Sequence, residues 1–105
     1  MTIKTIGRCL GQAHDGSLWF FCKGCGQPHS LKVGSGPGPR WGYNENPESP
    51  TFTPSVLVRW NEWEEAKVCH AFVTDGRIQY LADCTHALAG QTVDLPDWEA
   101  SWNSW

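Results

Sequence analysis

The stretch from residue 68 to residue 82 constrains the fold more than any other part of the sequence. It reads VCHAFVT, then Asp75-Gly76, then RIQYLA, with polar and apolar residues alternating on both sides of the pair. An Asp-Gly pair between two alternating segments is typical of a two-residue type I′ turn, because both central residues need a positive φ. The sequence therefore predicts an antiparallel hairpin in which Thr74 faces Arg77.

This register sorts the side chains of the predicted hairpin onto two faces, because successive side chains of a strand point to opposite sides. One face carries Cys69, Ala71, Val73, Ile78, Tyr80 and Ala82, so that Cys69 is expected to face Ala82. The other face carries His70, Phe72, Thr74, Arg77, Gln79, Leu81 and Asp83. The neighbours Cys69 and His70 then point in opposite directions. They cannot bind one metal ion unless the strand is bulged or ends there.

A short cysteine motif precedes the hairpin. Cys22 and Cys25 are separated by two residues and followed by Gly26, a spacing that lets two thiolates reach one zinc ion. His29 follows closely enough to be a further ligand, and the hairpin register favours Cys69 over His70 as the fourth. The sequence thus predicts a closed structural Zn²⁺ site. Its ligands would be Cys22, Cys25, His29 and Cys69.

Other interpretations of these cysteines remain open at this stage. The Cys22–Cys25 pair fits a redox dithiol, although no βαβ pattern surrounds it, and it also fits two incidental buried cysteines. Cys69 fits a small core residue on an apolar face. Cys9 and Cys84 are assigned to the core and not to a metal site.

A second, more polar group is formed by His70, Asp83 and His86. His70 and Asp83 are diagonal cross-strand neighbours in the predicted hairpin, within reach of each other. Their contact fits a hydrogen bond that fixes one histidine tautomer. It also fits a catalytic site, but the sequence names no nucleophile and no loop that would stabilise an oxyanion. Whether the protein is an enzyme is therefore left undecided.

The remaining elements are short strands and loops. Strands are expected over residues 2–6, 17–22, 29–33, 52–60 and 91–95, with Pro54 at an edge or a bulge. Irregular structure is expected over residues 34–50, a polar loop or single helical turn over 61–67, and a turn or short helix over 84–89. We predict a mainly β fold with little helix: a small zinc-stabilised bent sheet or sandwich with long loops. Residues 1–105 would form one zinc-binding domain, with a Trp-rich C-terminal arm over residues 96–105.

Composition narrows the functional classes. The 105 residues carry a net charge of −3 and no basic run, which disfavours binding to nucleic acid. No stretch approaches 18 apolar residues, and the first residues do not fit a signal peptide. We therefore expect no membrane segment and a location in a reducing cytoplasm, where five cysteines serve as metal ligands and spares and not as disulfides. Seven tryptophans favour a protein partner.

Several motifs together resemble a known family. They are Phe21-Cys22-x2-Cys25-Gly26-x2-His29, Trp41, Pro50-Thr51-Phe52-Thr53-Pro54-Ser55, Cys69-His70-x-Phe72, Asp75-Gly76-Arg77-Ile78-Gln79 and Asp83-Cys84-Thr85-His86-Ala87-Leu88-Ala89-Gly90-Gln91. Over residues 19–97 the chain resembles a family of small proteins of unknown function met mostly in tailed bacteriophages and prophages. Members are sometimes labelled "ammonia monooxygenase", but that enzyme is an integral-membrane copper protein and no segment here is long enough to span a bilayer. The resemblance implies a phage protein in the cytoplasm of a bacterial host, with a metal site.

Two functions follow as expectations. The first is a phage-encoded zinc-binding β module that binds and interferes with a host-cell protein through exposed aromatic side chains. The alternative is a metal-dependent hydrolase-like enzyme that uses His70, Asp83 and His86. The sequence names neither the partner nor the substrate, and it does not give the oligomeric state.

Overall fold

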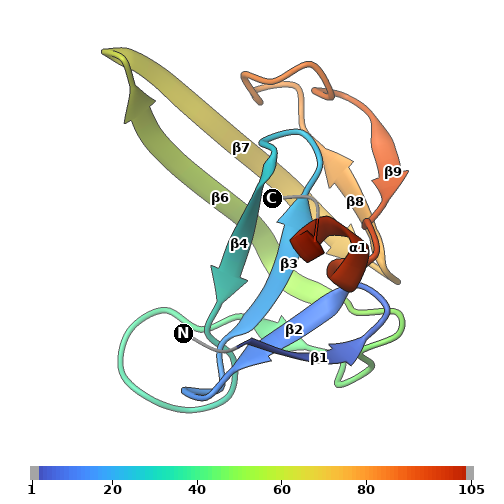
Figure 1. Cartoon of the computed structure of the whole chain (residues 1–105). Helices are drawn as coiled ribbons and strands as arrows, with labels where there is room; N and C mark the ends of the chain where they lie inside the picture. The colour runs from blue at the N-terminus through green and yellow to red at the C-terminus, as the bar shows by residue number, and fades with distance from the viewer. Residues whose placement is uncertain (1–2, 104–105) are drawn as a thin grey trace.

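The structure is a computed structural model that describes residues 3–103. For residues 101–103 it describes only the main chain. Two antiparallel sheets make up the structure. The first sheet has the order β1-β2-β3-β4 and the second the order β5-β6-β7-β8-β9 (Figure 1). The strands are β1 (Ile3–Gly7), β2 (Leu10–Ala13), β3 (Leu18–Cys22), β4 (Gln27–Leu31), β5 (Gly42–Tyr43), β6 (Phe52–Glu62), β7 (Glu65–Thr74), β8 (Arg77–Tyr80) and β9 (Thr92–Asp94). One helix, α1 (Trp98–Asn103), follows. The predicted mainly β fold with little helix is confirmed.

The hairpin of β7 and β8 forms as the Asp-Gly pair predicts. Thr74 pairs with Arg77, and Asp75 and Gly76 have φ angles of 51° and 77°. The ladder ends at the pair of Ala71 with Tyr80, so the expected pairing of Cys69 with Ala82 is wrong. The chain leaves the ladder after Tyr80 because residues 81–85 turn back to bond the main chain of β7 at Val68 and His70.

One core lies between the sheets. Alternate residues of β3 and β7 are buried, as the period of a strand facing a core requires. The largest fully buried side chains of the described residues include Trp98, Tyr80, Phe20 and Phe52. Trp98 belongs to the predicted C-terminal arm, and its backbone N–H donates to the Arg8 carbonyl oxygen at 2.8 Å. The arm's first turn is thus packed on the body of the protein; residues 104–105, with the last tryptophan, lie outside the described residues.

The clearest departure from the sequence-based elements is the connection between β6 and β7. A polar loop or helical turn over residues 61–67 was expected, but the two strands continue to Glu62 and from Glu65. The turn residues Trp63 and Glu64 take φ angles of 50° and 66°, which are those of a type I′ turn. The result is a long hairpin whose tip projects beyond the first sheet (Figure 1).

Smaller shifts affect the other elements. Strand β2 was not predicted, and β4 begins two residues before the expected range of 29–33. The expected bulge at Pro54 is confirmed by a register shift between Phe52 and Val56. Residues 84–89 form turns and not a helix. Among the helices of the described residues, none is long and apolar enough to cross a membrane.

Candidate active site and metal centre

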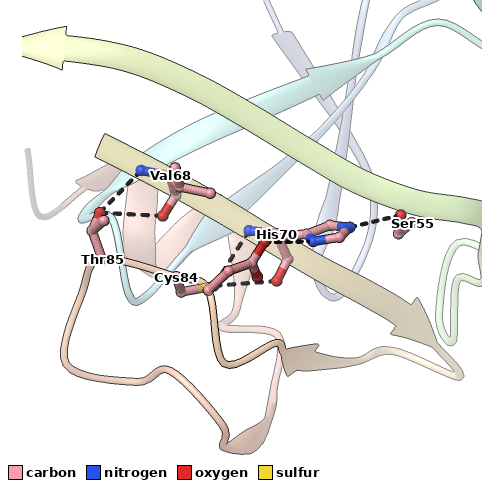
Figure 2. A network of polar contacts seen from close by, with 6 residues as sticks. Ser55, Val68, His70, Cys84 and Thr85 are labelled. Carbon is pink, nitrogen blue, oxygen red and sulfur yellow. Dashed lines mark hydrogen bonds and ion pairs between the residues drawn. The ribbon is translucent and has the colours of Figure 1, made fainter. Parts of the chain in front are cut away.

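Three side chains on the outer face of the second sheet form a continuous hydrogen-bonded chain. The Oγ of Ser55 lies 3.0 Å from Nε2 of His70, and Nδ1 of His70 lies 3.0 Å from Oδ2 of Asp83. Ser55 comes from β6, His70 from β7 and Asp83 from the turn after β8. Figure 2 shows the His70 ring lying across β7 with its far nitrogen directed at Ser55.

The partners of the imidazole determine its tautomer. An ionised carboxylate only accepts hydrogen bonds, so Nδ1 of His70 carries the proton that Asp83 binds. Nε2 is then the acceptor, and the Ser55 hydroxyl donates to it. A serine whose proton is directed at a histidine nitrogen, with that histidine oriented by a carboxylate, is the arrangement that activates serine nucleophiles on several unrelated folds.

Strand register brings Ser55 to His70. Leu57 is paired with His70 across β6 and β7, and Ser55 precedes Leu57 by two residues, on the same face of the strand. The bulge before Val56 changes the course of β6 at this point. The Ser55 carbonyl oxygen accepts a hydrogen bond of 3.2 Å from the Trp41 indole Nε1, which holds the main chain of the serine in place.

A second set of contacts positions the carboxylate. The main-chain N–H of His70 donates to Cys84 Sγ at 3.3 Å, and the Cys84 thiol donates to the His70 carbonyl oxygen at 3.1 Å. One residue later, Thr85 Oγ1 accepts from the Val68 N–H at 3.0 Å (Figure 2). Residues 83–85 are thereby held along the free side of β7. Asp83 consequently lies beside the ring of His70.

The sequence predicted part of this hydrogen-bonded chain and missed its serine. The contact between His70 and Asp83 is confirmed, although Asp83 lies in a turn and not on the strand. Ser55 was not among the candidates, even though it ends the Pro50–Ser55 motif. The pairing of β6 with β7 was the signal that could have found it. That pairing was missed because the turn at Trp63 and Glu64 contains neither Gly nor Asn.

His86, the third predicted member of the polar group, lies elsewhere. Its Nδ1 accepts a hydrogen bond of 3.2 Å from the Leu88 N–H, and its ring packs edge-on against Tyr80 at 4.5 Å. It shares a potential metal-binding group with Cys69 and Cys84. Among the described residues, no such group joins His86 to His70 and Asp83. The structure thus brings together two of these three residues.

The predicted zinc ligands meet between the two sheets. The ligand atoms of Cys22, Cys25, His29 and Cys69 all lie within 4.8 Å of one another. Cys22 ends β3, Cys25 lies in the following turn, His29 is in β4, and Cys69 comes from β7 of the other sheet. A metal ion held here would join the two sheets.

The donor set and its surroundings fit a metal ion. In a tetrahedral site with Zn–S bonds of about 2.3 Å, two sulfur ligands lie roughly 3.8 Å apart. Cys22 Sγ and Cys69 Sγ lie 3.7 Å apart, far beyond the length of a disulfide bond. His29 is 6% exposed, and its Nε2 has no hydrogen-bond partner among the described residues. A buried ring nitrogen without a partner is unfavourable, and a metal ion at this cluster would supply one.

The three thiols of this cluster shift one another's pKa values. Hydrogen bonds from Cys25 and Cys69, with a further one from the Tyr80 hydroxyl at 3.2 Å, hold the pKa of the Cys22 thiol well below its usual value. The contact with Cys22 raises the pKa of Cys25 to about 12 and also raises that of Cys69. Zinc is bound by thiolates, so a bound metal ion would favour ionisation of all three cysteines.

Comparison with known proteins finds one family. A family model described as "Bacterial ubiquitination-like system serine protease (BubE)" matches residues 4–81. No curated protein and no solved structure matches the chain. The matched range includes Ser55, His70 and all four residues of the cysteine–histidine cluster. Asp83 lies two residues beyond it, and the match does not bear on the phage origin implied by the motifs.

Proposed function

This chain belongs to the BubE family of bacterial ubiquitination-like system serine proteases, and we propose that it is itself a serine protease with Ser55 as nucleophile. His70 acts as the general base and Asp83 orients and stabilises its ring. The chain of two 3.0 Å contacts through His70 carries the proposal. The system in which it works is the bacterial ubiquitination-like system of the family's description, and its substrate is a peptide bond in a protein of that system.

The chemistry follows from the positions of these groups. Ser55 Oγ attacks the scissile carbonyl carbon while its proton passes to Nε2 of His70. Collapse of the tetrahedral intermediate expels the amine, which takes that proton, and leaves an ester on Ser55. Water, deprotonated by the same Nε2, then hydrolyses the ester and returns the proton to Ser55. Asp83 accepts the Nδ1–H bond throughout, so it favours the imidazolium that forms in each step.

We further propose that the cluster of Cys22, Cys25, His29 and Cys69 binds Zn²⁺. Three sulfur ligands and one nitrogen complete a tetrahedral shell and leave no position for substrate, which is the composition of structural zinc sites. The ion would tie β3 and β4 to β7. Cys69 lies on the inner face of β7 and His70 on its outer face, so zinc would stabilise the strand that carries the base and take no part in the reaction.

The expected interference with a bacterial host protein stays a prediction that no described contact tests. The proposed protease is preferred because its reacting groups are already in contact with one another.

Reaction with a fluorophosphonate probe tests the proposed nucleophile. The probe forms a covalent bond with an activated serine, and intact-mass and peptide analysis should place the adduct on Ser55. Ser55→Ala should remove the labelling, whereas Ser30→Ala, at an exposed serine of β4, should retain it. Absence of labelling in the wild type, or labelling that persists in Ser55→Ala, would show that Ser55 is not an activated nucleophile.

A further inference from the structure

The hydrogen bonds of β7 show which main-chain groups of β6 point outward. The N–H and C=O groups of both Val68 and His70 bond to residues 81–85 and not to β6. Antiparallel partners alternate between pairs that exchange both hydrogen bonds and pairs that exchange none. The partners of Val68 and His70, which are Arg59 and Leu57, therefore direct their own N–H and C=O groups to the outer edge of β6.

That outer edge is free over half of the strand. Strand β5 pairs only with Phe52 and Thr53, and the Trp41 indole binds the Ser55 carbonyl oxygen. Beyond Ser55, no strand of the described residues pairs with this side of β6 (Figure 1). Long uncovered edges are usually protected by charge, proline or a covering loop. On this edge, the first residue after the bulge whose main-chain groups point outward is Leu57, which is neither charged nor a proline.

Apolar side chains surround the histidine on the adjoining face. Leu57 is 42% exposed and Phe72 is 44% exposed. Leu57 is the cross-strand partner of His70, and Phe72 follows His70 by two residues on the same face of β7. Two of the three exposed large hydrophobic side chains of the described residues thus flank the base.

We propose that the substrate binds as an extended peptide that pairs with the free edge of β6 over residues 57–61, with an apolar side chain over Leu57 and Phe72. The inference rests on the proposed protease activity and defines its substrate class as an unstructured tail or loop of a protein. Strand addition uses main-chain groups for affinity and alternate side chains for selectivity. The nucleophile lies on the same strand, two residues before Leu57, so a peptide paired with residues 57–61 ends its paired run next to Ser55, where the Trp41 indole covers the edge.

An N-methyl scan tests this mode of binding. The probe is an acetylated pentapeptide p-nitrophenyl ester of alternating alanine and leucine, and each of its amides is methylated in turn. In a strand that pairs with one neighbour, every second amide N–H forms a hydrogen bond. Methylation of any of these paired amides should therefore lower kcat/KM by about fivefold to tenfold per lost bond. Methylation at the intervening amides should change it by less than about twofold. The intervening amides are thus matched controls within the same peptide.

A substitution in the protein tests the same hydrogen bond between the peptide and the edge of β6. Leu57→Pro removes the outward N–H, and proline is tolerated on edge strands where no ladder bond is lost. The variant also loses the Leu57 side chain, so it should hydrolyse the parent ester at least as slowly as the wild type hydrolyses the most affected methylated ester. Methylation of that amide should cause no further loss in the variant, because the hydrogen bond is already absent. Melting temperature and metal content establish whether the variant is folded. If Leu57→Pro is not folded, the N-methyl scan on the wild-type protein alone tests the proposal.

The outcomes separate this proposal from the one on which it rests. Alternating losses support strand addition. Equal losses at every amide, or none, overturn it while leaving the protease proposal intact, provided that p-nitrophenyl acetate and the parent ester are hydrolysed and Ser55→Ala hydrolyses neither. A dimer that Leu57→Pro converts to monomer would assign the edge to a second copy of this chain and overturn it as well. If the wild type hydrolyses none of the esters faster than Ser55→Ala does, both proposals are overturned.

Discussion

The two faces of β7 carry side-chain clusters that differ in their exposure to solvent. The inner cluster consists of Cys22, Cys25, His29 and Cys69, and the outer cluster consists of Ser55, His70 and Asp83. On the inner side, Cys69 is 2% exposed and meets two other thiols and the imidazole of His29 between the sheets. On the outer side, the next residue, His70, has a side chain that is 25% exposed, and its partner Asp83 has one that is 56% exposed. One cluster is closed to solvent and offers a full set of ligands to one ion. The other is open to an incoming molecule.

This difference bears on how a chain of 105 residues would support the proposed protease site. Small domains bury a low fraction of their surface and gain stability from a structural metal. The inner cluster would supply that stability at the strand from which His70 projects. Damage to the inner cluster should therefore disable both sides, whereas damage to the outer cluster should leave the inner one intact. The predictions below test this asymmetry.

The largest effect is expected from Cys22→Ser. Zinc binding in small domains contributes on the order of 10 kcal/mol, comparable to the whole stability of a domain. The variant should lose its metal, its cooperative melting transition and its labelling by fluorophosphonate. Elemental analysis and circular dichroism provide the measurements.

Cys9→Ser is the matched control for that variant. Cys9 is equally buried but belongs to no metal-binding group of the described residues. It should keep the metal and lose about 1–3 kcal/mol for a buried hydroxyl. If Cys22→Ser melts like the wild type and retains its metal, the inner cluster is not a structural site.

The reverse experiment is His70→Ala. Loss of the base should lower kcat/KM for p-nitrophenyl acetate by at least about 10³-fold. Metal content should be unchanged, and the free energy of unfolding should fall by about 1 kcal/mol, since a half-buried ring and its two hydrogen bonds are removed. His14→Ala, at an exposed histidine in a turn, should change neither quantity. Loss of the metal in His70→Ala would show that the two sides of β7 are not separable.

A smaller loss of activity is expected from Asp83→Asn. The amide of asparagine can donate a hydrogen bond to Nδ1, which favours the tautomer with the proton on Nε2 and prevents that nitrogen from accepting the Ser55 proton. We expect kcat/KM to fall by about 10²-fold to 10⁴-fold, with the melting temperature nearly unchanged. An activity equal to that of the wild type would mean that Asp83 does not orient the base.

The inner cluster could be predicted from sequence because its signals are local. Cys22 and Cys25 lie within one turn. The Asp75-Gly76 turn fixes the register of its hairpin, and this register determines that the Cys69 side chain faces the core. The outer site depends on a register across β6 and β7, which is set by the turn at Trp63 and Glu64. Neither residue type favours a positive φ, so the turn gave no signal and Ser55 could not be placed beside His70. Strand β2 was missed because its four residues, LGQA, show little β propensity.

That unfavourable turn leads to the smallest predicted effect, from Glu64→Gly. Glu64 has a φ of 66°, a conformation that costs non-glycine residues about 1 kcal/mol and glycine almost nothing. The variant should be more stable by about 0.5–1 kcal/mol, a rise of a few degrees in melting temperature. Metal content and labelling of Ser55 should stay unchanged, because the tip lies outside both clusters. Glu62→Gly, in the extended strand beside it, should instead lower stability by a similar amount. A fall in stability for Glu64→Gly would show that the Glu64 side chain makes a contact at the tip worth more than the strain it causes.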